Sequence, residues 1–168
     1  FDDPDRGKEV FGILHSVIGV VLVVRGGFKI FEKVIHDQTQ IFLDKHKILY
    51  NFQSGFRKNY STDTALSYLS NKIQSSYDNG LLTGMILIDL QKAFDTIDHK
   101  IFLKKLRCLG FSATAIAWYK SYLENRFFTV NLEESFSEKT LLTCGVPQGS
   151  ILGPLIFLIY VNDMSQAV

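Results

Sequence analysis

Cysteine, proline and tryptophan are scarce in this chain of 168 residues, which contains two, three and one of them, respectively. Cys108 and Cys144 lie far apart and outside any Cys-x-x-Cys pattern, which argues against a zinc site or a disulfide framework. We expect both to be reduced, buried thiols. An excess of charge of one sign is also lacking, and the net charge of +1 does not by itself indicate a nucleic-acid partner.

Long hydrophobic runs are missing as well. The apolar run from Val10 to Val24 falls short of the ~20 residues that a membrane-spanning helix needs. The preceding nine residues carry mixed charge, whereas a signal peptide begins with a basic segment. We therefore expect no membrane partner, with an anchor as the minor alternative, and interpret residues 1–27 as an unassigned segment, foreign or mis-joined to the rest.

The remaining residues indicate one folded domain, because 46% of the chain is hydrophobic and no internal repeat or linker divides it. Apolar spacing, caps and turn residues predict an α+β order of elements. Helices are expected at Lys29–Leu49, from Ser61 to Ile73, from Asp98 to Leu109, from Ser112 to Asn125 and at Leu155–Met164, with strands at Thr83–Leu90, Phe127–Leu132 and Thr140–Val146. The expected N-terminal caps are Ser61, Asp98 and Ser112.

The most informative segment is residues 86–99, ILIDLQKAFDTIDH. Asp89 stands at the end of a run of apolar β-formers, where we expect a buried strand. A carboxylate in such a place is costly unless it is paired or holds a cation. Because hard oxygen ligands suit a hard cation that also binds phosphate, Mg²⁺ is the favoured interpretation.

Two further segments flank this one. Residues 52–66, FQSGFRKNYSTDTAL, place Arg57 and Lys58 beside aromatic residues, a pattern that suits phosphate neutralisation together with base stacking. Residues 145–164, GVPQGSILGPLIFLIYVNDM, begin with a loop rich in glycine and proline. Such a loop lets the backbone approach a ligand closely while staying rigid.

In this order and spacing, the three segments resemble the fingers motif, the first palm motif and the Pro-Gln-Gly motif of reverse transcriptases from non-LTR (LINE-type) retrotransposons. The resemblance is continuous from about Phe28 onward. It implies an RNA-directed DNA polymerase with an α+β, partial right-hand polymerase fold, in which residues 28–168 form fingers and an incomplete palm. The implied partners are an RNA template, a DNA primer and dNTPs, in a ribonucleoprotein of the nucleus and cytoplasm. The oligomeric state is not indicated.

The same resemblance implies roles for individual residues. Asp89 is the expected catalytic residue and ligand of Mg²⁺ or Mn²⁺, and Leu90 would add its backbone carbonyl. Phe94 is either a steric gate against a ribose 2′-hydroxyl or a core residue. The nucleotide pocket is expected to contain Phe94, Arg57, Pro147, Gln148 and Gly149, and template contacts are expected from Arg57 and Lys58.

Other polar residues near Asp89 have plainer interpretations. Asp95 lies six residues further on and is expected to brace the turn or to cap the next helix rather than to bind metal directly. Asp98 is most simply a helix cap. His99 invites a general-base role, but a lone histidine at the start of a helix is usually structural.

The sequence departs from the family in one important respect. A Tyr/Phe-x-Asp-Asp hairpin, which supplies the remaining metal ligands in the family, is not found before Val168, and Asp163 is not expected to replace it. We therefore expect negligible extension of a primed RNA template by this chain alone, with Mg²⁺ or Mn²⁺. Two alternatives stay open: a non-catalytic retroelement remnant that at most binds RNA or a partner, and a maturase of the group II intron type.

Overall fold

A computed structural model describes residues 27–132 and 135–166 of the chain. The interpretation of residues 1–27 as a foreign segment therefore lies almost entirely outside the described residues. The described helices are α3 (Gly27–Lys45), α4 (Thr62–Asp78), α5 (His99–Cys108), α6 (Ala113–Leu123), α7 (Gly153–Val161) and the 3₁₀ helix η1 (Met164–Gln166). The strands are β1 (Phe127–Phe128), β2 (Asn131–Leu132), β3 (Ser135–Phe136) and β4 (Thr140–Leu141). The predicted mixture of helix and sheet is confirmed.

Helix α3 has a buried face, which is mainly apolar, and a second apolar stripe that is exposed. The buried face repeats every three to four residues, as one face of an α-helix must, and consists of Glu32, Ile35, Thr39, Phe42 and Leu43. The second stripe, with Ile30, Val34 and Ile41, is exposed. The apolar spacing therefore predicted the helix correctly, but it did not distinguish the two faces.

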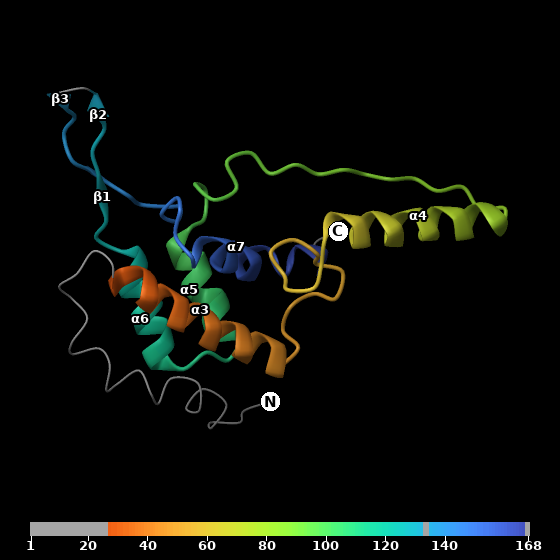
Figure 1. Ribbon diagram of the computed structural model, residues 1–168, viewed down its shortest axis with the longest axis horizontal. Coiled ribbons are helices and arrows are strands. Elements are labelled where there is room, and N and C mark those ends of the chain that lie inside the picture. Colours follow the sequence, from red (N-terminus) through yellow and green to blue (C-terminus); the bar gives the residue numbers. More distant parts are fainter. Residues whose placement is uncertain (1–26, 133–134, 167–168) are drawn as a thin grey trace.

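The hydrophobic core lies where α3, α5, α6 and α7 gather into a cluster, as Figure 1 shows. Helix α7 is apolar on all sides, which is typical of a helix enclosed by others. Aromatic contacts join the helices, with ring centroids 5.5 Å apart for Phe102 and Tyr119. The largest fully buried side chains are Ile35, Phe42, Leu43, Ile97, Phe102, Leu106, Tyr119, Leu123, Leu152, Ile156, Leu158 and Ile159.

The three predicted N-terminal caps are confirmed. The Asp98 carboxylate accepts a hydrogen bond from the Ile101 amide at 2.9 Å, and the Ser112 hydroxyl accepts one from Ala115 at 3.2 Å. Ser61 and Thr64 exchange side-chain and backbone hydrogen bonds in a capping box. Each cap satisfies amides that the first helical turn leaves without an intrahelical partner.

Residues 79–91 form an extended arm that returns from α4 to the helical cluster (Figure 1). Helix α4 itself lies away from that cluster and buries none of its side chains. The predicted buried strand Thr83–Leu90 is wrong: this segment is not assigned as a strand, and all its residues are exposed. A strand requires a hydrogen-bonded neighbour, and residues 82–91 make no backbone hydrogen bond to any other described residue.

The strands form a hairpin in two parts, which extends from the end of α6 (Figure 1). Strand β1 pairs antiparallel with β4, and β2 pairs antiparallel with β3 closer to the tip. The predicted hairpin is confirmed, although its strands are shorter than expected. Beyond β4, Cys144 makes an isolated bridge with Asp98 and so attaches the hairpin to the start of α5.

The two cysteines are free, as expected, but their predicted burial is wrong, because both are exposed. Cys108 ends α5, two residues beyond the core residue Leu106, and therefore lies on another side of the helix. Among the described residues, no helix is both long enough and apolar enough to cross a membrane.

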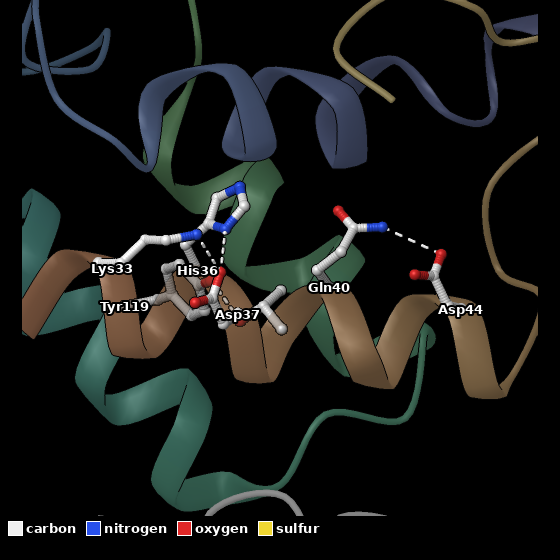
Figure 2. A network of polar contacts seen from close by, with 7 residues as sticks. Lys33, His36, Asp37, Gln40, Asp44 and Tyr119 are labelled. Atoms are coloured by element: carbon white, nitrogen blue, oxygen red, sulfur yellow. Dashed lines mark hydrogen bonds and ion pairs between the residues drawn. The ribbon is translucent and has the colours of Figure 1, made fainter. Parts of the chain in front are cut away.

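Polar contacts run along α3 between half-buried and exposed side chains, as Figure 2 shows. Lys33 and His36 both contact the Asp37 carboxylate, and Gln40 donates to Asp44 at 3.0 Å. The hydrogen bond from Lys33 is the main cause that lowers the pKa of Asp37, followed by that from His36. Tyr119 reaches α3 from α6, and its buried hydroxyl lies 2.9 Å from that of Thr39.

Candidate active site

The candidate site forms where the turn before α5 meets the loop after β4. The amide of Val146 donates to the carbonyl of Phe94 at 3.0 Å, and that of Gly145 donates to the carbonyl of Ile97 at 2.8 Å. His99, which is buried, donates from Nε2 to the carbonyl of Gly145 at 2.7 Å, because a carbonyl can only accept. The structural interpretation of His99 is thereby confirmed.

Gly145 is required for this close approach. Its φ is +82°, and a Cβ at this position would lie 2.9 Å from the carbonyl oxygen of Asp95. A side chain here would meet both a strained backbone and a backbone atom that has no room to move. The glycine thus lets two distant segments of the chain pack backbone against backbone.

A pocket of about 360 Å³ lies between these two segments. Of the five residues expected at the nucleotide pocket, four line it: Phe94, Pro147, Gln148 and Gly149. The fifth, Arg57, does not. The tertiary structure therefore brings together residues that are more than fifty positions apart in the sequence.

The Asp95 side chain contacts the Pro-Gln-Gly loop, whereas the cap of α5 is Asp98. The Asp95 carboxylate accepts a hydrogen bond of 3.4 Å from the side-chain amide of Gln148, across the mouth formed by the two segments. This contact leaves the Gln148 carbonyl oxygen and its second amide hydrogen for another partner. Asp95 was absent from the predicted site residues, although it also lines the pocket.

Phe94 is half-buried and belongs to an aromatic cluster with Phe56 and Phe157. The ring centroids of Phe94 and Phe157 are 5.0 Å apart, and those of Phe94 and Phe56 are 5.9 Å apart. Phe94 thus packs against α7 and the loop of Phe56, at the edge of the core, while the same ring also lines the pocket. Through Phe56, the fingers-type segment reaches this site.

Asp89 and Leu90 line a second pocket, of about 380 Å³, at the point where the extended arm joins the cluster. Its opposite wall comes from α5 and the end of α7, and includes Lys105 and Asp163. The Lys105 ammonium pairs with the Asp163 carboxylate and also donates to the Tyr160 carbonyl at 2.6 Å. Both carboxylates are exposed, but only Asp163 forms an ion pair among the described residues.

Whether a metal ion fits depends on the donors that the structure brings together. Among residues 27–132 and 135–166, no group of three or more His, Cys, Asp or Glu side chains is arranged to hold a metal ion. A single exposed carboxylate does not hold a divalent cation firmly in water, since such ions usually take several oxygen ligands. The described residues therefore do not by themselves form a metal centre.

Arg57 and Lys58 lie on the loop before α4 and line neither pocket. Arg57 donates to the carbonyls of Tyr50 and Gln53, at 3.1 and 3.2 Å, and its guanidinium lies 4.4 Å from the centre of the Tyr60 ring. It therefore holds its own loop together. Lys58 is exposed, and a nucleic-acid role for either residue stays a prediction.

Comparison with known proteins places these observations in a family. The profile of the reverse transcriptase (RNA-dependent DNA polymerase) family matches residues 21–168. The chain belongs to the reverse transcriptase family. Members of this family use divalent metal ions, and the resemblance drawn from the three sequence segments is confirmed.

Individual relatives point to retrotransposons. The chain is 34% identical over 136 residues to the "Probable RNA-directed DNA polymerase from transposon BS" of Drosophila melanogaster, a match covering 81% of this chain. It is 32% identical over 136 residues to the RNA-directed DNA polymerase from mobile element jockey of the same species. A protein named after intron 2 of COX1/OXI3 in Saccharomyces cerevisiae is 28% identical over 144 residues. The chain spans about 15% of the length of each of these relatives.

Proposed function

We propose that this chain forms the fingers and part of the palm of an RNA-directed DNA polymerase that copies retrotransposon RNA. The substrates would be an RNA template, a DNA primer and dNTPs, and the polymerase would act within a ribonucleoprotein. The observation that carries the proposal is the pocket between residues 94–95 and 146–149, which collects four predicted nucleotide-binding residues. Family membership and the retrotransposon relatives support it.

Each residue of the pocket has a chemical task in this proposal. Gln148 offers both a donor and an acceptor to a template base or an incoming nucleotide, while Asp95 keeps its amide oriented. Pro147 makes the loop stiff. Phe94 packs against Phe56 and Phe157 and lines the pocket, where its ring would collide with a ribose 2′-hydroxyl.

Asp89 is the proposed ligand for Mg²⁺, with Mn²⁺ as a substitute, and Leu90 would contribute its carbonyl. Its carboxylate is exposed in the pocket beside the nucleotide site, while the other acidic side chain there, Asp163, is paired with Lys105. In a polymerase, a divalent ion supplies charge stabilisation at phosphate oxygens. The carboxylates that would complete such a site are not among the described residues.

The test compares Asp89→Asn with Asp163→Asn in a full-length retrotransposon polymerase that contains this segment. Incorporation of dNTPs on a primed RNA template should fall roughly a hundredfold or more in the first variant, because metal stabilisation is worth several kcal/mol. Asp163→Asn should lose far less, because it removes only a surface ion pair. Equal losses in the two variants would contradict the assignment of Asp89.

A further inference from the structure

Glu32 is a buried carboxylate that the three sequence motifs do not include. It lies on the buried face of α3 and is 1% exposed. A buried carboxylate is destabilising unless its oxygens are hydrogen-bonded. One oxygen accepts from the Tyr122 hydroxyl at 2.6 Å, and the other accepts from the backbone amide of Ile151 at 3.1 Å. One side chain therefore links α3, α6 and the segment that follows Pro-Gln-Gly.

Lys29, one turn earlier on α3, strengthens the same link. Its ammonium donates to the carbonyl of Gly149 and lies 3.9 Å from the Glu32 carboxylate. Lys29 thus binds the carbonyl of Gly149, just before Ser150, and Glu32 binds the amide of Ile151, just after it. The Ser150 hydroxyl between them accepts a hydrogen bond from the Gly153 amide at 2.9 Å.

The loop is consequently held from two sides. On one side, three hydrogen bonds bind it to the turn before α5. Val146 donates to Phe94, Gly145 donates to Ile97, and the Gln148 side chain donates to Asp95. On the other side, Lys29 and Glu32 of α3 bind the backbone of Gly149 and Ile151. Gly149 has a φ of +75°, and a Cβ there would meet no atom within 4 Å, so the position of Gly149 itself is not fixed by packing around a Cβ.

We infer that Glu32, assisted by Lys29, is a positioning residue for the nucleotide pocket. Glu32 acts through its hydrogen bond with the Ile151 amide and thereby sets the positions of Gln148 and Gly149. Glu32 does not line the pocket itself. This inference rests on the proposed function for its catalytic consequence. Its structural part concerns the loop alone and is testable without polymerase activity.

The first experiment measures backbone amide hydrogen exchange in the 168-residue chain. In Glu32→Ala, the Ile151 amide should exchange about tenfold faster or more, because its charged acceptor is lost. Lys33→Ala is the matched control: Lys33 is the next residue, is exposed and pairs with Asp37, so this variant should leave the loop unchanged. Unchanged exchange of Ile151 in Glu32→Ala would overturn the inference.

Two conservative variants separate geometry from charge and cover the case in which Glu32→Ala does not fold. Glu32→Gln keeps the length of the side chain and an oxygen that accepts from Ile151. Glu32→Asp keeps the charge but is too short to reach both Tyr122 and Ile151. Exchange of Ile151 should therefore be slower in Glu32→Gln than in Glu32→Asp, and the reverse order would overturn a role through this contact.

The second experiment measures steady-state kinetics in the full-length polymerase that contains this segment. Glu32→Asp and Lys29→Ala should raise the KM for dNTP by about three- to tenfold with little change in kcat, because ground-state binding is affected. Glu32→Gln, which keeps the acceptor for the Ile151 amide, should stay close to the unmodified polymerase. A variant that merely unfolds in part would lower kcat at constant KM, and that result would overturn the inference. If the unmodified polymerase incorporates no dNTP, the proposed function fails, while the exchange data still decide the positioning role.

Discussion

Single residues determine how closely the two segments of the candidate site approach each other. Gly145 and Gly149 both have positive φ, in the same loop and four positions apart, yet their surroundings differ. At Gly145, a Cβ would lie 2.9 Å from the Asp95 carbonyl oxygen, whereas at Gly149 it would meet nothing. The two positions thus separate backbone strain from steric collision.

Substitution of either glycine by alanine makes this separation measurable. Gly149→Ala should lower the free energy of unfolding by about 1 kcal/mol, the cost of placing a side chain in the left-handed region. Gly145→Ala should lower it by about 2 kcal/mol or more, because the collision with Asp95 adds to the same strain. Urea denaturation provides the measurement, and equal losses would show that the approach to Asp95 is looser than the structure indicates.

Two buried tyrosines predict how stability depends on pH. Burial raises the pKa of Tyr119 above its ordinary value of 10.0, and burial followed by the hydrogen bond to Glu32 does the same for Tyr122. Above pH 10 the unfolded chain therefore releases these protons before the folded chain does. Because the unfolded state then binds fewer protons, stability falls as the pH rises.

The check is thermal unfolding between pH 8 and 11, with Tyr119→Phe and Tyr77→Phe as a matched pair. In Tyr119→Phe, the free energy of unfolding should decrease less steeply with rising pH, by up to about 1.4 kcal/mol per pH unit. The reason is that unfolding of this variant releases one proton fewer. Tyr77 is 77% exposed, so its replacement should leave the slope unchanged. An unaltered slope in Tyr119→Phe would contradict a raised pKa of Tyr119 in the folded chain.

At the scale of elements, local signals in the sequence predicted every described α-helix, and they did so through caps and apolar spacing. Asp98, Ser61 and Ser112 were identified as caps because their side chains satisfy amides only a few residues away. The one element predicted wrongly, the strand Thr83–Leu90, depends on a distant partner. Apolar β-formers indicate a preference for extended backbone, but they do not provide the neighbour that completes a strand.

The caps should differ in their effect on global stability. Asp98→Ala should lower the free energy of unfolding by about 1 kcal/mol, because α5 is part of the core. Ser61→Ala removes an equivalent cap, but α4 buries no side chain, so only the helix end should fray. Circular dichroism of Ser61→Ala should then show lower helicity and an unchanged midpoint of the main unfolding transition. An equal shift of that midpoint in Ser61→Ala and Asp98→Ala would mean that α4 unfolds together with the core.

At the scale of the whole molecule, the helical cluster holds the core, while α4 and the extended arm lie outside it (Figure 1). The arm exposes a series of apolar side chains, Leu82 fully and Ile86 at 86%. Residues 82–91 also lack backbone hydrogen bonds to other described residues. Both features make a chain segment accessible to proteases.

Among the described residues, limited proteolysis with thermolysin should therefore cut first between residues 81 and 88. The apolar residues of α7 offer similar side chains to the protease, but they are buried within the cluster and should be cut only after global unfolding. Mass spectrometry of early fragments identifies the sites. Cleavage in α7 at the same rate as in the arm would contradict the arrangement described here.

The family, the order of the helices and four residues of the candidate pocket were determined by the sequence alone, because motifs and caps depend on residues close together in the chain. For Glu32, the sequence indicated only that a carboxylate shares the helical face of Ile35 and Thr39 on α3. Its partners Tyr122 and Ile151 could not be predicted from the sequence. Only the tertiary structure decided that Asp89 is exposed, that Asp95 meets Gln148 and that α3 holds the Pro-Gln-Gly loop. Each of these contacts or exposures depends on segments that are distant in sequence, and their juxtaposition is set by packing rather than by local preference.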